Sequence, residues 1–279
     1  MHSLSVIARR PLRTWLPIAA IAALLAFAVP SHGTTARRAD AVKPTIVLVH
    51  GAFADGSSWS PVAMRLQKLG YKVLVPANPL ISVDYDAAYL RAILTKISGP
   101  VILVGHSYGG VAITNAATGL PNVKALVYVA AYAPNTGDSV VSLEKLAPGG
   151  EIGPPTLDIT QVPSPTGGNE SVATIQQPLF RHIFAADLPA AVANAMAVSQ
   201  RPAALGLLLE PSGTPAWKTI PSWYVVPGAD NAIGTKVEMI MAHRIHAHIT
   251  VVPGASHVVM ISHPAVVTKV IVAAADARG

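Results

Sequence analysis

The chain of 279 residues contains no cysteine. Disulfide bonds, thiol catalysis and thiolate metal sites are therefore excluded. Charged residues are also scarce, at 12%, whereas apolar residues make up 51% of the chain. That balance supplies a large hydrophobic core and argues against a disordered chain. The length lies in the range of one large α/β domain or two small ones.

No apolar run near the N-terminus is long enough to cross a membrane. The run at residues 15–29 has about 15 residues, whereas a spanning helix needs roughly 20. Arg9, Arg10 and Arg13 precede this run, and a basic segment before a short apolar segment is typical of an export signal. The Arg9-Arg10 pair also resembles the start of a twin-arginine signal.

We expect residues 1–41 to form this signal peptide and a linker, with cleavage after Gly33 or after Ala41. The mature protein would then be secreted or periplasmic and would have no stable membrane anchor. The removed segment carries five Arg and one Asp, so most of the formal net charge of +6 belongs to it. The charge of the chain therefore gives no indication of a nucleic-acid partner.

The first half of the remaining chain alternates between short apolar runs and segments with helical spacing. Runs of strand length lie at 45–49, 71–75, 101–104 and 123–129, and helical patterns lie at 60–69, 82–97 and 111–117. Continuous apolar runs are typical of strands buried on both faces, and the alternation indicates a parallel sheet flanked by helices. Ser57 or Ser58 is expected to cap the first of these helices.

The alternation stops between residues 135 and 221. The stretch 147–168 is rich in Pro and Gly and predicts irregular structure, whereas 171–184 and 188–199 predict helices, the second capped by Asp187. An insertion of roughly 85 residues in an alternating sheet predicts a mainly helical cap over the active face. The sheet and its helices then resume, with strands at 222–226 and 248–252 and helices at 236–246 and 264–274.

The sequence Gly105-His106-Ser107-Tyr108-Gly109 lies between one of the apolar runs and a helical segment. A G-x-S-x-G pattern in that position is typical of a nucleophile elbow. Gly105 and Gly109 stand where a Cβ would collide with the neighbouring backbone of so tight a turn. The pattern predicts that Ser107 is a nucleophile whose hydroxyl is held out of the sheet.

A serine nucleophile needs a base that removes its proton, and that base needs a carboxylate that orients it. We predict His257 as the base, because it lies in the loop after the last expected strand. His50 and His106 are nearer to Ser107 in sequence, but we expect them to bond to local backbone.

Two carboxylates are candidates for the orienting acid. Asp230 follows the strand at 222–226, which yields the chain order Ser107, Asp230, His257 that is known for this type of triad. Asp138, after the preceding strand, is the alternative.

An oxyanion hole would complete the site. Its first donor is the N–H of Tyr108, at the start of a helix, where backbone N–H groups are unpaired. The second donor is expected from the loop after the first strand, as the N–H of Ala52 or, alternatively, of Phe53.

No cofactor or metal is expected. No Lys-Ser/Thr pair follows the glycines of the elbow, so the sequence has no P-loop there. The clustered residues His243, His246 and His248 have neither an H-E-x-x-H pattern nor a carboxylate that would complete a metal site.

Taken together, His50-Gly51, Gly105 to Gly110, Asp230 and Ser256-His257 resemble the α/β-hydrolase fold family, over about residues 43–279. The resemblance implies an α/β-hydrolase domain over residues 42–279. Its sheet would be mostly parallel. We expect about six strands instead of the family's eight, because the first strand of this chain corresponds to the third strand of the family's sheet.

Within that family, the start His50 to Phe53 and the segment Trp223 to Ile233 look most like one branch. It holds plant methylesterases, hydroxynitrile lyases and bacterial pyrethroid-type esterases. The lyases have a lysine directly after the base, where this chain has Val258. Dehalogenases and epoxide hydrolases use an aspartate as nucleophile, so Ser107 argues against both.

The resulting prediction is a secreted serine esterase that cleaves small carboxylic esters through an acyl-enzyme intermediate. Two alternatives remain. One is a non-catalytic homologue that binds a small ligand, and the other is lipase or haloperoxidase-like activity on the same triad. The expected pocket walls are the aromatic residues Phe53, Trp59, Tyr132, Phe180, Phe184 and Trp217.

Overall fold

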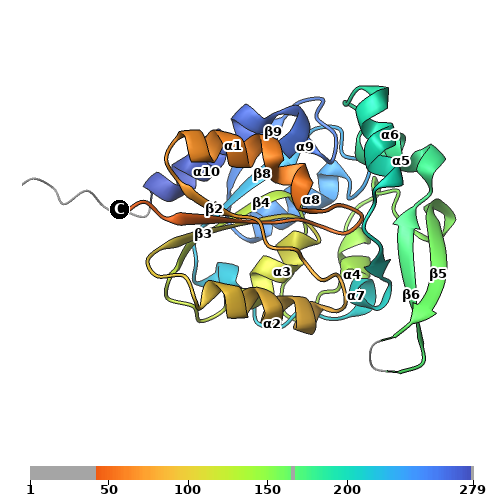
Figure 1. Cartoon of the computed structure of the whole chain (residues 1–279), viewed down its shortest axis with the longest axis horizontal. Helices are drawn as coiled ribbons and strands as arrows, with labels where there is room; N and C mark the ends of the chain where they lie inside the picture. The colour runs from red at the N-terminus through yellow and green to blue at the C-terminus, as the bar shows by residue number, and fades with distance from the viewer. Residues whose placement is uncertain (1–41, 165–166, 278–279) are drawn as a thin grey trace, which may run out of the picture. The chain divides into compact units, whose positions relative to one another are not determined.

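A parallel sheet of six strands lies at the centre of the structure, in the order β2-β1-β3-β4-β8-β9 (Figure 1). The computed structural model describes residues 42–164 and 167–277. The predicted export signal lies outside these described residues. The strands are β1 (Thr45–Val49), β2 (Lys72–Leu74), β3 (Val101–Ser107), β4 (Val123–Ala131), β8 (Ser222–Pro227) and β9 (His248–Val252).

Burial differs between the middle and the edges of this sheet. Every residue of β1 and β3 is buried, which agrees with their continuous apolar sequences. The edge strands β2 and β9 are partly exposed. All six predicted strands are present, and the predicted fold class is confirmed.

Helices cover both faces of the sheet: α1 and α10 lie on one face, and α2 and α3 on the other (Figure 1). The helices expected from the apolar spacing are present, with ends that differ by a few residues. They are α1 (Ser60–Lys68), α2 (Val83–Leu94), α3 (Gly109–Ala116), α8 (Thr235–Arg244) and α10 (Pro264–Asp276), and a short helix, α9 (Val259–Ser262), precedes the last.

The expected cap of α1 is wrong. A single 3-10 turn, η1 (Gly56–Trp59), precedes the helix, and the Asp55 carboxylate accepts the N–H of Ser57 at 2.7 Å. Asp55 therefore caps this turn, and α1 continues from it without a side-chain cap of its own.

Residues 135–221, here called the cap segment, connect β4 to β8. Beside its helices, the segment contains an antiparallel sheet of three strands, β5-β6-β7. Figure 1 shows α5, α6, β5 and β6 together at one end of the central sheet. Its elements are α4 (Val140–Glu144), η2 (Pro154–Thr156), β5 (Leu157–Pro163), β6 (Asn169–Ile175), α5 (Gln177–Phe184), α6 (Ala190–Val198), β7 (Ala203–Ala204), α7 (Gly206–Leu209) and η3 (Ala216–Lys218).

Two secondary-structure predictions fail in the cap segment. The stretch 147–168 is not wholly irregular, because it contains β5, and the helix predicted for 171–184 begins only at Gln177. Strand β6 takes up the first part of that range, where Val172 and Thr174 favour an extended backbone. Strand β6 pairs with β5 over its whole length, and this pairing is what the local helical spacing could not reveal.

No helix among the described residues is long and apolar enough to cross a membrane.

Candidate active site

Ser107 ends β3 and directly precedes the turn into α3, and its backbone is strained. It has φ +53°, a left-handed conformation that is uncommon for residues other than glycine. The two glycines of the elbow have the predicted steric role. A Cβ on Gly105 would lie 2.6 Å from the carbonyl oxygen of Gly109, and a Cβ on Gly109 would lie 2.6 Å from that of Val49.

Asp230 and His257 form a fully buried pair after the ends of β8 and β9. The Nδ1 of His257 lies 2.6 Å from Oδ2 of Asp230, and both side chains are inaccessible to solvent. The other carboxylate oxygen accepts the N–H groups of Ala232 at 2.7 Å and Ile233 at 3.0 Å. The turn after β8 therefore fixes the carboxylate in the orientation that meets the imidazole.

The charge of Asp230 follows from these contacts. Burial by itself would raise the pKa of this carboxyl, but the attraction to His257 and the hydrogen bonds to the carboxylate outweigh burial and lower its pKa to about 2. Asp230 is therefore ionised near neutral pH, as a residue that orients a histidine base must be.

The remaining nitrogen of His257 is available for proton transfer. Its Nε2 is buried and has no hydrogen-bond partner among the described residues. The neighbour of the nucleophile, His106, lies against this base: its Nε2 donates to the carbonyl oxygen of His257 at 3.1 Å, and the two ring centroids are 4.6 Å apart. The elbow and the base loop are thus joined directly beside Ser107.

His106 differs from its expected role. We predicted a bond to local backbone, but its partner belongs to a loop far along the chain. Burial and the neighbouring His257 hold the pKa of His106 well below its ordinary value, so this ring is neutral. A neutral ring in this place holds the base loop without adding a positive charge to it.

The loop after β1 lies against the nucleophile, where the second oxyanion donor was predicted. A Cβ on Gly51 would lie 2.5 Å from Cβ and 3.2 Å from Oγ of Ser107. Phe53 in this loop has φ +62°. The backbone N–H groups of Ala52 and Tyr108 have no acceptor within residues 42–164 and 167–277. They are therefore free to bind a developing oxyanion.

His50 makes the expected bond to local backbone at Gly51 and a second bond to Asn78, which lies 28 residues along the chain. Its Nδ1 donates to the carbonyl oxygen of Gly51 at 2.9 Å, and its Nε2 accepts the N–H of Asn78 at 2.9 Å. Burial lowers the pKa of His50. The ring therefore acts as a neutral bridge that fixes the loop after β1.

The alternative acid, Asp138, is not brought to His257. Its Oδ2 accepts the N–H of Asn135 at 2.8 Å and forms an ion pair with Arg244 at 2.9 Å. Both contacts of Oδ2 hold the start of the cap segment. The geometry therefore favours Asp230 as the acid.

Asp187 is not the helix cap that we expected. Helix α6 begins after Pro189 without a side-chain cap. The Asp187 carboxylate instead accepts the hydroxyl of Ser256, and it lies 3.8 Å from Nδ1 of His263. Because Ser256 directly precedes His257, this contact ties the cap segment to the base loop.

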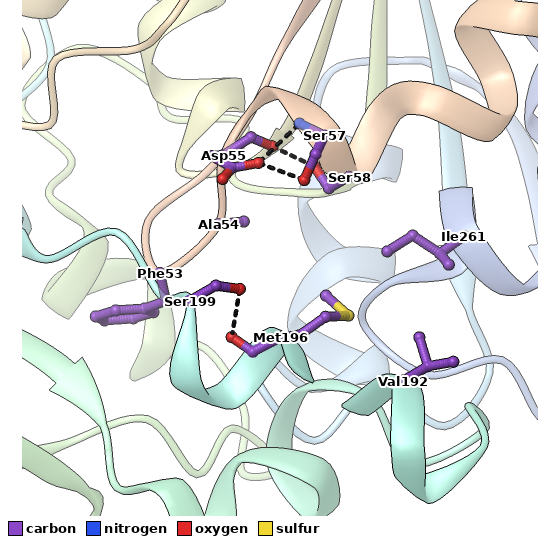
Figure 2. A pocket seen from close by; sticks show the side chains of 9 residues that line it. All are labelled: Phe53, Ala54, Asp55, Ser57, Ser58, Val192, Met196, Ser199 and Ile261. Atoms are coloured by element: carbon purple, nitrogen blue, oxygen red, sulfur yellow. Dashed lines mark hydrogen bonds between the residues drawn. The ribbon is translucent and has the colours of Figure 1, made fainter. Parts of the chain in front are cut away.

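A small groove of about 190 Å³ lies between the loop after β1 and helix α6 (Figure 2). One side is polar and includes Asp55, whose carboxylate bonds to Ser57. The opposite side is apolar and includes Val192 and Met196 from α6. The lining residues are Phe53, Ala54, Asp55, Ser57, Ser58, Val192, Met196, Ser199 and Ile261.

Of the six predicted pocket residues, Phe53 lines this groove. Trp59, Phe180 and Phe184 are completely buried. The ring of Phe184 lies 4.7 Å from that of His257, and the ring of Trp59 lies 6.4 Å from that of His106. These aromatic side chains pack around the histidines and thereby support the base.

The other two predicted pocket residues have different surroundings. Tyr132 is buried, and its hydroxyl donates to Glu144 at 2.7 Å. Trp217 lines a separate depression with Ser222 and His248, the first residues of β8 and β9. Those positions are at the amino ends of the strands, so Trp217 is not a wall of the site around Ser107.

Sequence reasoning missed two buried carboxyls, Asp86 and Glu238. Asp86 accepts the Tyr108 hydroxyl at 3.1 Å and the N–H of Leu80 at 3.1 Å, and burial raises its pKa to about 6. Glu238, in α8, lies beside Asp230. Asp86 and Glu238 each occupy a core-facing position of a helix. An acidic residue among the apolar residues of a helix is the sequence signal that could have identified them.

Three of these groups also have the spacing of metal ligands. Asp230, Glu238 and His257 each offer one ligand atom, and these atoms lie within 4.8 Å of one another. The Nδ1 of His257, however, is already bonded to Asp230. A cation bound through that nitrogen would displace the hydrogen bond, so we interpret Asp230 and His257 as a hydrogen-bonded pair and not as metal ligands.

Comparison with known proteins agrees with this geometry. Residues 46–270 match the alpha/beta hydrolase family. A carbendazim hydrolyzing esterase from a Nocardioides species is 36% identical over 110 residues, which are 35% of this chain and 46% of that esterase. The match thus spans less than half of that esterase's length.

Solved structures with low sequence identity share the fold. An Arabidopsis methylesterase superposes with a TM-score of 0.67 at 19% identity, covering 84% of this chain and 99% of that chain. A pyrethroid hydrolase from Sphingobium faniae does so with a TM-score of 0.65 at 23% identity, covering 84% of this chain and 98% of that chain. The predicted family and the predicted class of ester hydrolase are in agreement with these relatives.

Proposed function

Because this chain belongs to the alpha/beta hydrolase family, we propose that it is an esterase that cleaves small carboxylic esters through an acyl-enzyme on Ser107. The observation that carries the proposal is the buried Asp230–His257 pair, whose Nε2 has no partner among the described residues and whose imidazole ring contacts His106 of the elbow. Such a pair is what a serine needs to become a nucleophile.

In the proposed reaction, His257 Nε2 takes the hydroxyl proton of Ser107 while Oγ attacks the ester carbonyl. The N–H groups of Ala52 and Tyr108 stabilise the negative charge that develops on the carbonyl oxygen. The C–O bond then breaks, and the leaving alcohol takes the proton from His257. Water, deprotonated by the same histidine, releases the acid from Ser107 and restores the hydroxyl.

The groove beside Phe53 is the proposed binding place for one of the two substituents of the ester. Its apolar side, with Val192 and Met196, suits an alkyl or aromatic group. The relative from Nocardioides is named for the hydrolysis of carbendazim. Carbendazim is therefore a reasonable second test substrate beside simple esters.

Export of the protein is part of this proposal. Its support is the sequence pattern near the N-terminus, where Arg9, Arg10 and Arg13 precede the short apolar run at residues 15–29. N-terminal sequencing of the protein from the culture medium or periplasm tests it. The expected new N-terminus follows Gly33 or Ala41, and an intact Met1 in the cytoplasm would contradict export.

The test of the activity is turnover of p-nitrophenyl acetate by the full chain and by Ser107→Ala. We expect the substitution to remove nearly all turnover, because the acyl-enzyme cannot form. Ser57→Ala, which alters a hydroxyl in the groove, is the control and should keep the same turnover of this small ester within a few-fold. Equal turnover by wild type and Ser107→Ala would refute the mechanism.

A further inference from the structure

Glu238 is a buried carboxyl beside the proposed triad acid, and the mechanism above does not use it. It lies on the inner face of α8 and has no solvent exposure. One of its oxygens lies within 4.8 Å of a carboxylate oxygen of Asp230 and of a ring nitrogen of His257. An isolated buried charge is expensive, so a carboxyl in this place needs an explanation.

The groups around Glu238 offer it no positive partner. Asp230 and His257 face it from the loops after β8 and β9, and Tyr132, directly after β4, and Tyr224, in β8, interact with it. Both tyrosine hydroxyls donate elsewhere, to Glu144 and to the carbonyl oxygen of Ala131. Apart from the neighbouring Asp230 carboxylate, the carboxyl oxygens of Glu238 have no hydrogen-bond partner among the described residues.

Two carboxyls at this separation cannot both be ionised in a buried site. Asp230 has His257 and two backbone N–H groups as donors, so the negative charge belongs there. Glu238 lacks these donors. Burial, and then the charge of Asp230, raise the pKa of Glu238 well above its ordinary value.

We propose that Glu238 is a positioning residue that stays protonated and donates its carboxyl proton to Asp230. This inference rests on the proposed function of Asp230 and His257. The donated hydrogen bond adds a further donor to the carboxylate and fixes its orientation from the α8 side. Asp230 then carries the single negative charge next to His257, and this charge alone stabilises the imidazolium.

Two substitutions separate this role from a structural one. In Glu238→Gln the amide N–H₂ still donates to Asp230, whereas Glu238→Met has a similar length and no donor. Glu144→Gln is the matched control, because Glu144 is also a carboxyl with little exposure but bonds to the Tyr132 hydroxyl. The readout is the pH profile of kcat/KM for p-nitrophenyl acetate, measured with the full chain.

For Glu238→Gln we expect kcat/KM within about threefold of wild type and an unchanged midpoint of the acid limb, because no charge is removed. For Glu238→Met we expect roughly tenfold lower kcat, the typical loss of a hydrogen bond to a charged group, and a higher midpoint, because Asp230 becomes more basic. Glu144→Gln should leave the midpoint unchanged.

Other outcomes would overturn the inference. A midpoint that moves to lower pH in Glu238→Gln would mean that a negative charge has been removed, and thus that Glu238 was ionised. Equal losses in Glu238→Gln and Glu238→Met with unchanged pH profiles would mean a purely structural role.

A spectroscopic readout keeps this inference separate from the proposed function. A protonated carboxylic acid has a carbonyl stretch distinct from that of a carboxylate, and infrared spectroscopy of the full chain detects it without any substrate. We expect this band near neutral pH in wild type and its loss in Glu238→Gln. Its presence in an inactive protein would contradict the esterase and leave the protonated Glu238 standing, whereas its absence from wild type would overturn the inference.

Discussion

The carboxyl edge of the central sheet and the cap segment are held in different ways. At the sheet edge, Ser107 is the last residue of β3, and Asp230 and His257 lie in the loops after β8 and β9, so the strand ladder determines where their backbones lie. The cap segment has no such frame. It is built from short elements that contact partners distant in sequence, such as Asp187 with Ser256 and Glu210 with the first N–H groups of α2.

This difference indicates which region carries the proposed chemistry and which region selects the substrate. In the proposed function, the sheet edge supplies the groups that react. The cap segment supplies helix α6, one wall of the groove beside Phe53. Substitutions at the edge should therefore change the rate of chemistry, and those in the cap segment should mainly change which ester is accepted.

The sharpest test of this comparison sets one aspartate from each region against the other. Asp230→Asn removes the charge that orients His257, and we expect kcat to fall by about 10⁴. Asp138→Asn weakens only an ion pair with Arg244 at the start of the cap segment, so kcat should stay within about threefold. Steady-state kinetics on p-nitrophenyl acetate measures both, and an equal loss in the two variants would erase the distinction.

A second prediction concerns the stability of the contact between α2 and the elbow, where Asp86 accepts the Tyr108 hydroxyl. Burial raises the pKa of Asp86 from 3.8 to about 6, so the folded state binds this proton more tightly than the unfolded state. Proton binding at Asp86 therefore contributes to the free energy of unfolding. This contribution is complete below about pH 3.8 and is lost as the pH rises through 6, and the free energy of unfolding changes by roughly 3 kcal/mol. Asp86→Asn resembles the protonated form at every pH.

Urea denaturation at several pH values checks this prediction. The free energy of unfolding of Asp86→Asn, relative to wild type, should increase between pH 4 and pH 7 and then stay constant. A difference that does not depend on pH would show that burial of Asp86 does not disfavour its charge.

The smallest expected effect is at the contact between the two regions. Asp187→Asn replaces a charged acceptor of the Ser256 hydroxyl by a neutral one. A loss of about 1 kcal/mol would lower kcat/KM roughly fivefold, because the base loop is held less firmly. Glu151→Gln, in the exposed ion pair with His182 of the cap segment, is the control and should have no effect. Identical kinetics of Asp187→Asn and wild type would show that the cap does not position the base.

The same comparison explains what sequence reasoning could predict. The apolar runs and the elbow pattern predicted the strands of the central sheet. The inner strands β1 and β3 are buried throughout, and such burial is visible in a strand's own residues. The hydrogen bond between His257 and Asp230 then followed from the positions of their loops after β9 and β8.

The remainder depends on contacts between distant segments. Strand β6 pairs with β5 and β7, and that pairing overrides the helical spacing of residues 171–184. The roles of Asp187 and His106 are likewise set by partners far along the chain. Glu238 was missed because an acidic residue among helical residues is usually exposed, and only the packing of α8 shows that this one is buried.

The central claim is that Ser107 is the nucleophile, and a fluorophosphonate probe tests it most directly. Wild type and Ser107→Ala would be treated with the probe, digested, and mapped by mass spectrometry. We predict one adduct on the peptide that contains Ser107 and none in Ser107→Ala. No adduct on the wild-type protein, or an adduct on a different serine, would contradict the account.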